Sequence, residues 1–88
     1  MLAKRSVVEI VHEILQVDGR KKTHIMYKTA LTHPQMVRYL NVLTERGLIA
    51  KNSDGNGGEV YKVTERGRDL SRHLDVVIGY LGLGDESV

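Results

Sequence analysis

Three polar residues between positions 32 and 46 have the types and spacing needed to read the edges of DNA base pairs. They are Gln35, Arg38 and Asn41. On a helix, at about 100° per residue, they lie on the side away from an apolar stripe. Arginine can bond guanine through two acceptors, and asparagine or glutamine can bond adenine in a similar bidentate way. These residues are our candidates for base contacts, and the alternative is a polar helix face that only water covers.

The helix that carries these residues has clear boundaries in the sequence. Thr32 and Gln35 are spaced as a capping box, in which each side chain bonds the backbone amide of the other residue. Pro34 suits the first turn, where a missing amide hydrogen costs little. Gly47 is suited to the position that follows a helix end, so we expect the helix to run from Thr32 to about Arg46. The residues expected to face the core are Met36, Leu40 and Leu43.

A second set of residues could contact DNA phosphates, which position a protein without reading its sequence. The candidates on or beside helices are Lys21, Lys22, Thr23, Lys28, His33 and Tyr39. The candidates on an expected hairpin are Lys51, Asn56 and Lys62, of which Asn56 could reach the minor groove. An alternative interpretation of the lysines is that they are solvated surface residues without a role in binding. Tyr39 lies beside the apolar stripe, and packing at the core boundary explains it as well as a DNA contact does.

Hydrophobic periodicity predicts three further helices. The first runs from Ser6 to Val17, with Ser6 and Glu9 spaced as another capping box. A shorter one begins with Thr23 as its N-cap and ends near Ala30. Its core-facing residues are expected to be Ile25, Met26 and Ala30. Residues 64–67 open the last helix, which reaches about Leu81 among glycines.

Residues 48–63 are predicted to form a β-hairpin. Segments 48–51 and 59–63 have the composition of short strands, and the loop 52–58 between them is rich in Gly, Asn and Asp. The order helix, helix, helix, hairpin, helix is that of a winged helix-turn-helix. The expected fold class is therefore mainly α with a small hairpin. The expected division is a DNA-binding domain at 1–64, a dimerisation helix at 65–82 and a disordered tail at 83–88.

The last helix carries an apolar stripe at heptad spacing, which suggests a seam between two copies of the chain. The residues of this stripe are Leu70, Leu74, Val77, Ile78 and Leu81. The alternative is packing within one domain core, but Val76 and Tyr80 widen the apolar surface beyond one side. A chain of 88 residues buries little surface and has no cysteine for a disulfide, which leaves self-association as a way to add stability.

Charge and missing motifs narrow the class of function. Residues 1–51 hold nine Lys or Arg against four acids, a net charge of +5 that suits a polyanion such as nucleic acid. Residues 52–88 hold four Lys or Arg against seven acids, a net charge of −3. The sequence has no nucleotide-binding or metalloprotease motif, its four histidines are scattered, and no stretch suits a membrane span. We expect a non-enzymatic protein without cofactor or metal, soluble in the cytoplasm and associated with the nucleoid.

Several short motifs of this chain resemble the archaeal winged-helix predicted transcriptional regulators, over about residues 4–81. The segments that carry the resemblance are Arg5-Ser6, Glu9-Ile10, Ile14-Leu15, Thr23-His24-Ile25-Met26-Tyr27-Lys28, Tyr39-Leu40-x-x-Leu43, Gly47-Leu48-Ile49 and Tyr61-x-x-Thr64-x-x-Gly67. That family includes small chromatin-type DNA-binding proteins of crenarchaea. The resemblance implies a winged helix, duplex DNA as partner and a homodimer joined through the last helix as an antiparallel coiled coil. Family members often have a longer final helix than one ending near Leu81.

The leading hypothesis is a double-stranded-DNA-binding homodimer that regulates transcription. One alternative is an architectural, chromatin-type protein with little sequence specificity. A second is a protein-interaction module that would use the acidic second half and the apolar last helix. A third is a regulator whose effector binds at the dimer interface.

Overall fold

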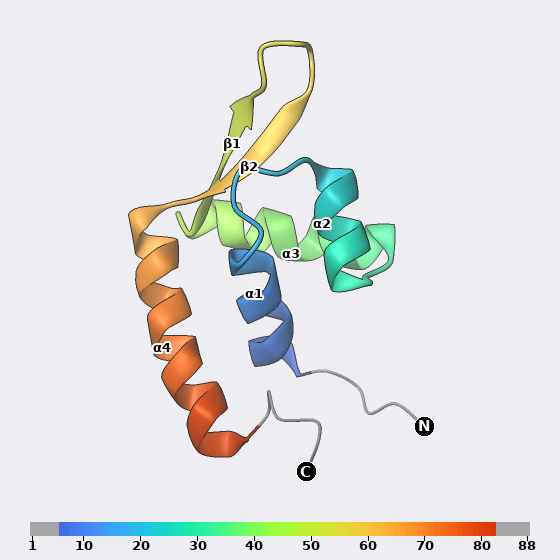
Figure 1. Cartoon of the computed structure of the whole chain (residues 1–88). Coiled ribbons are helices and arrows are strands. Elements are labelled where there is room, and N and C mark those ends of the chain that lie inside the picture. The colour runs from blue at the N-terminus through green and yellow to red at the C-terminus, as the bar shows by residue number, and fades with distance from the viewer. Residues whose placement is uncertain (1–5, 83–88) are drawn as a thin grey trace.

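The computed structural model describes residues 6–82 of the chain, as four helices and one antiparallel hairpin (Figure 1). The elements in chain order are α1 (Val7–Leu15), α2 (Lys22–Thr29), α3 (His33–Glu45), β1 (Ile49–Ser53), β2 (Glu59–Val63) and α4 (Glu65–Leu81). This order confirms the predicted fold class. The predicted disordered tail, residues 83–88, lies outside the described residues.

Both predicted capping boxes are present. At α1 the amide of Glu9 donates to Oγ of Ser6 over 3.2 Å, and the amide of Ser6 donates to Oε1 of Glu9 over 2.8 Å. At α3 the equivalent distances between Thr32 and Gln35 are 3.3 and 3.0 Å. Each pair satisfies two backbone amides that a helix start leaves without partners, so the local sequence sets where α1 and α3 begin.

The start of α2 differs from the prediction. Thr23 is not the N-cap: Lys21 takes that position without a side-chain cap, and Lys22 is already helical. The reason is tertiary, because the chain just before α2 is held extended where Arg20 pairs with Tyr61 of β2. The predicted inward position of Ala30 is also wrong, since Ala30 is exposed and ends the helix with a φ of 56°. Thr29 is buried in its place, and its hydroxyl donates to the carbonyl of Ile25 over 2.7 Å.

The hairpin pairs residues 49–53 with residues 59–63, in a register that runs from Ile49 opposite Val63 to Ser53 opposite Glu59. We call residues 49–63 the wing. The segment after α1 forms an isolated β-bridge with β2 of the wing. The amide of Gly19 donates to the carbonyl of Tyr61, and the amide of Tyr61 donates to the carbonyl of Arg20. Because these bonds join distant parts of the chain, they fix the wing to the helical body.

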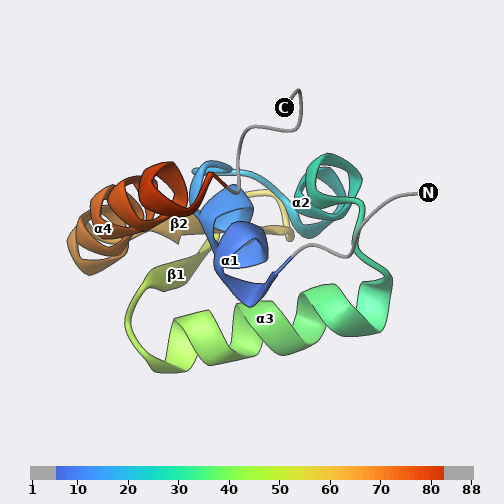
Figure 2. The same ribbon diagram turned by 90° about the horizontal axis from the view of Figure 1, so that it is seen from below.

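One hydrophobic core joins the three N-terminal helices and the base of the wing. Its buried residues include Ile14 of α1, Ile25 of α2 and Ile49 of β1. The predicted core residues of α3, Met36, Leu40 and Leu43, are each no more than 3% exposed. Viewed from below, α3 lies along one edge of the molecule, and α1, α2 and α4 all lie on the same side of it (Figure 2). The opposite side of α3 therefore faces solvent.

The start of α4 is held against the turn between α3 and β1 by a close backbone contact. The hydroxyl of Thr64 donates to the carbonyl of Gly47 over 2.6 Å, and the amide of Thr64 donates to the carbonyl of Leu48 over 3.1 Å. Gly67 is buried here, and a Cβ on this residue would overlap with the carbonyl oxygen of Leu48. Glycine is needed for this approach, which sets the direction in which α4 leaves the wing.

We therefore expect Gly67→Ala to lower the free energy of unfolding by about 1–3 kcal/mol, because the backbone must shift to admit the methyl group. The measurement is urea unfolding followed by circular dichroism. Gly79→Ala is the matched control, since a Cβ there meets nothing within 4 Å. In the same helix that control should gain up to about 1 kcal/mol from helix propensity. Equal stabilisation by both substitutions would contradict the close contact.

Candidate nucleic-acid interface

The outer side of α3 presents Arg38 and Asn41 to solvent. They are three residues apart, so their side chains are neighbours on successive turns of the helix. Neither makes a hydrogen bond or ion pair with any residue between 6 and 82. The buried stripe of α3 points the other way, so these two side chains stand on a rigid support with their polar groups available to a ligand.

Gln35 lies at the start of the same helix, but its side chain is partly committed. Its Oε1 accepts the amide of Thr32 in the capping box, at 3.0 Å. A bidentate bond to adenine needs that oxygen as an acceptor and Nε2 as a donor at the same time. In this conformation Nε2 is the group that remains for a base, so Gln35 is placed as a donor.

Val42 is an apolar residue on the outer side of α3, and it is 42% exposed. Sequence reasoning did not select it, although an apolar side chain on the polar face of an amphipathic helix was a visible signal. Such a side chain can contact the methyl group of thymine. Tyr39, in contrast, is half-buried and packs against the core, while His33 is exposed at the first turn.

The basic candidates divide by their partners. The ammonium of Lys21 lies 3.2 Å from Oδ2 of Asp54, and that of Lys51 lies 3.9 Å from Oε2 of Glu59. The remaining three candidate lysines make no ion pair with a described residue. These are Lys22, half-buried at the first position of α2, and the exposed Lys28 and Lys62.

Thr23 and Lys28 lie at opposite ends of α2. Thr23 is exposed at the second position of the helix. Lys28 lines an open groove together with His24, Arg20 and residues 16–18. The structure therefore places Lys28 on the side of α2 next to the segment that follows α1.

The tip of the wing is organised around Asp54. The amides of Asn56 and Gly58 donate to Oδ1 of this carboxylate over 2.8 and 3.0 Å. These two backbone bonds, together with the Lys21 ammonium, hold the pKa of Asp54 below its usual value. Asn56 itself is exposed at the tip.

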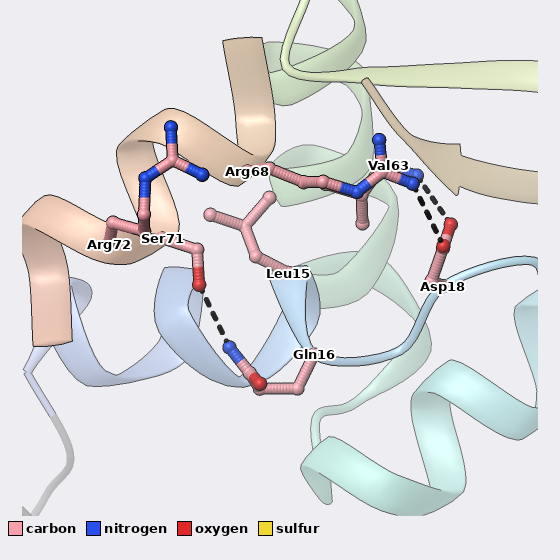
Figure 3. Close-up of a pocket in the computed structure, with 7 residues that line it drawn as sticks. All are labelled: Leu15, Gln16, Asp18, Val63, Arg68, Ser71 and Arg72. Atoms are coloured by element: carbon pink, nitrogen blue, oxygen red, sulfur yellow. Dashed lines mark hydrogen bonds and ion pairs between the residues drawn. The ribbon is translucent and has the colours of Figure 1, made fainter. Parts of the chain in front are cut away.

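Side-chain bonds fasten α4 to α1 beside an open pocket of about 280 Å³ (Figure 3). Gln16 donates to Oγ of Ser71 over 3.0 Å, and the guanidinium of Arg68 lies 3.5 Å from Oδ2 of Asp18. Figure 3 marks both contacts with dashed lines. One turn further along α4, His12 and Asp75 share a hydrogen bond of 2.5 Å. These contacts join α4 to the domain along much of its length.

The predicted dimerisation stripe is divided between two environments. Leu70 and Leu74 pack against the core of their own chain, and Ile78 is half-buried beside Glu9 and His12 of α1. The exposed apolar residues of α4 are Val76, Val77, Tyr80 and Leu81. The exposed apolar side chains of α4 therefore lie toward its C-terminal end.

The described residues lack two features of other classes of protein. No helix in residues 6–82 is long and apolar enough to cross a membrane. Within the same residues, no three His, Asp or Glu side chains are placed so that they could hold a metal ion.

The order of the elements and the outward side of α3 agree with a known family. A model of the winged helix-turn-helix family matches residues 4–80. The chain belongs to this family. An uncharacterized protein of the archaeon Methanocaldococcus jannaschii is 35% identical over 74 residues, which are 81% of this chain and 71% of that protein.

Solved winged-helix structures show the same fold. Sso10a-2, a DNA-binding protein from Sulfolobus solfataricus, superposes with a TM-score of 0.82 at 24% identity, over 89% of this chain and 83% of its own. A MarR-family transcriptional regulator from Rhodococcus sp. RHA1 gives 0.73 at 22% identity, over 90% of this chain and 61% of its own. The transcriptional repressor CouR, bound to a 23-mer DNA duplex, superposes with a TM-score of 0.68 at 22% identity, over 77% of this chain and 52% of its own. The chain thus spans little more than half of the two regulators.

The lowered pKa of Asp54 gives a pH prediction for the wing. Because the charged form is favoured in the folded state, its contribution to wing order is complete above the unfolded pKa of about 3.9 and is lost as the pH falls through the lower folded pKa. The amide NMR shifts of Asn56 and Gly58 should report a midpoint below 3.9. Asp54→Asn, which cannot titrate, should remove this transition. A midpoint at or above 3.9 in the unmodified protein would contradict the hydrogen-bond arrangement.

Proposed function

We propose that this protein binds double-stranded DNA as a homodimeric transcriptional regulator, with α3 in the major groove. The observation that carries the proposal is the outer side of α3. Arg38 and Asn41 project from it with no partner among residues 6–82, while the opposite side is locked in the core. A helix fixed in this way can enter the groove without losing its own packing.

The geometry of B-DNA supports this use of α3. The major groove is about 12 Å wide and admits one α-helix. Because α3 lies at an edge of the molecule, no other helix stands between its outer side and an approaching duplex (Figure 2). Arg38 and Asn41 supply the groups that distinguish guanine and adenine in that groove, and Val42 supplies an apolar contact.

Charge supports the same partner. The net charge of +5 in residues 1–51 favours a polyanion. Within residues 6–51, which form α1, α2, α3 and the start of β1, seven Lys or Arg stand against four acids. Lys22 of α2 and Lys62 of β2 are candidates for phosphate contacts, because neither is neutralised by an acid among the described residues. Thr23, His33 and the amides at the start of α2 would add weaker phosphate contacts.

The similar proteins support DNA as the partner. Sso10a-2 is described as a DNA-binding protein, and CouR was solved on a DNA duplex. The regulators among the similar structures favour control of transcription, whereas the likeness to Sso10a-2 favours a second candidate, an architectural protein with little sequence specificity. Sequence discrimination separates the two functions.

The direct test selects bound duplexes from a random pool and compares the affinity for an enriched sequence with that for a scrambled one. Arg38→Ala and Asn41→Ala should each reduce this discrimination by about 1–3 kcal/mol, because each loses a base contact. Absence of any enriched sequence, with tight binding to all duplexes, would support the architectural function and contradict the regulator.

Lys22→Ala provides a contrast with the base-contact variants. It should weaken binding to every duplex and lower the slope of log affinity against log salt by roughly one unit, because one phosphate contact is lost. Arg72→Ala is the matched control, since it removes the same charge from α4, where Arg72 pairs with Asp69. If no duplex is bound at moderate salt, the proposed function is wrong.

The homodimer is part of the proposal, and the structure suggests which part of α4 would form it. Leu70 and Leu74 are occupied by their own core, so the surface left for a second copy is Val77 and Leu81 together with Val76 and Tyr80. Burial of these side chains against an identical surface would stabilise a two-fold dimer. It would also set the distance between two α3 helices, which for adjacent major grooves is about 34 Å. In this proposal residues 1–64 bind DNA and residues 65–82 join the copies.

Charge substitutions at this surface test the dimer. Tyr80 is 87% exposed and Leu81 is 64% exposed, so Tyr80→Glu and Leu81→Glu should leave the folded monomer intact. Each should weaken dimerisation more than tenfold, because the substituted residue occurs twice in a two-fold interface. Light scattering at micromolar concentration measures the mass. Gly79→Glu introduces the same charge on another side of the helix and should leave the mass unchanged. Dimers that persist in both variants would contradict this interface.

A further inference from the structure

The tip of the wing has a single carboxylate at its centre. Oδ1 of Asp54 accepts the amides of Asn56 and Gly58, and the amide of Asp54 donates to the carbonyl of Gly58 over 3.0 Å. The Asp54 side chain is only 14% exposed although it lies in a surface loop. One side chain thus determines the path of the backbone on both sides of Asn56.

The glycines of the tip complete this arrangement. Gly55 and Gly57 have φ values of 85° and 84°, a conformation that other residues rarely adopt. A Cβ on Gly58 would lie 2.6 Å from Oδ2 of Asp54, so glycine leaves room for the carboxylate. Because three of the four residues from 55 to 58 lack a side chain, Asn56 is the one that projects from a narrow tip.

Lys21 connects this tip to the helical body. It is the N-cap residue of α2, and its ammonium lies 3.2 Å from Oδ2 of Asp54. The contact joins the tip to the helix whose first turn carries candidate phosphate contacts. It also neutralises a carboxylate that would otherwise repel an approaching phosphate backbone.

We propose that Asp54 is a positioning residue that, together with Lys21, holds Asn56 in the orientation needed to read the minor groove. The proposal rests on the proposed DNA binding and changes the role of Lys21 from a phosphate contact to a clamp on the wing. The minor groove is about 6 Å wide, so a tip with one small side chain fits it. A tip that is already ordered also loses less conformational freedom on binding.

The minor groove gives this arrangement a specific readout. In that groove A·T pairs show only acceptors, and a G·C pair adds the 2-amino group of guanine. Inosine lacks this amino group, so an I·C duplex resembles A·T in the minor groove and G·C in the major groove. The ratio of affinities for I·C and G·C duplexes of otherwise equal sequence therefore measures minor-groove reading separately from α3.

The experiment measures this ratio for the full chain and a set of variants. The unmodified protein should prefer the I·C duplex about fivefold or more, because the 2-amino group of guanine would obstruct a side chain that donates to the acceptors on the floor of the minor groove. Asp54→Ala should reduce the ratio to near one, because the bonds to Asn56, Gly58 and Lys21 are all lost. Asp54→Asn keeps an oxygen for the two amides but loses the Lys21 contact, so it should restore the preference only in part. Glu59→Ala is the matched control, since it removes one negative charge from the first residue of β2 and leaves the bonds of Asp54 in place, and its ratio should remain that of the unmodified protein.

The ion pair is tested by a double-substitution cycle. Lys21→Met and Asp54→Asn each remove the same contact, so the two together should lower the ratio no further than either one alone. If Lys21 instead binds phosphate, Lys21→Met would weaken both duplexes equally and leave the ratio unchanged, which would overturn the clamp. Urea unfolding of every variant shows whether a change in ratio arises from loss of the fold.

The remaining outcomes separate this inference from the proposed function. Tighter binding of Asp54→Ala to both duplexes with an unchanged ratio would show that Asp54 only repels DNA. A ratio near one in the unmodified protein would show that the wing does not read the minor groove. Either result overturns the inference while DNA binding stands. No binding to either duplex would overturn both.

Discussion

Met36, Leu40 and Leu43 enter the core from one side of α3, and this burial is the contact on which the rest of the arrangement depends. It anchors the helix through three large side chains and leaves Arg38 and Asn41 on the other side. A surface helix of 13 residues would be marginally stable alone. Packing against α1, α2 and the base of the wing makes it a rigid support, and rigidity is what a groove-reading helix needs to hold its polar groups in a fixed pattern.

The wing is stabilised in a different way, because its tip has almost no apolar surface to bury. At its base Ile49, Tyr61 and Val63 belong to the core, and the chain around Gly19 and Arg20 adds backbone hydrogen bonds to β2. At its tip the order comes from the carboxylate of Asp54 and from glycines with positive φ. The two ends of one hairpin thus rely on separate physical interactions, hydrophobic burial at the base and charge-assisted hydrogen bonds at the tip.

The last helix also serves two surfaces. Its first half packs against the core, with Gly67 in close contact with the carbonyl of Leu48. Its second half carries exposed apolar residues, and the bonds of Gln16 to Ser71 and of His12 to Asp75 keep it aligned with α1. Because both halves of α4 are held against the rest of the domain, any surface formed by Val77, Tyr80 and Leu81 has a defined orientation relative to α3. In the proposed homodimer, that relation would let α4 set the distance between the two copies of α3.

The sequence by itself determined the order of the elements, the starts of α1 and α3, the extent of β2 and the core side of α3. These depend on interactions within a few residues, such as capping boxes, or on a periodicity that one helix shows alone. Only the tertiary structure decided that α2 begins at Lys22 rather than after Thr23, that Lys21 pairs with Asp54, and that Leu70 and Leu74 pack inward while Tyr80 does not. Each of these outcomes depends on groups from distant parts of the chain that meet only in the folded protein, and local sequence carries no record of which groups those are.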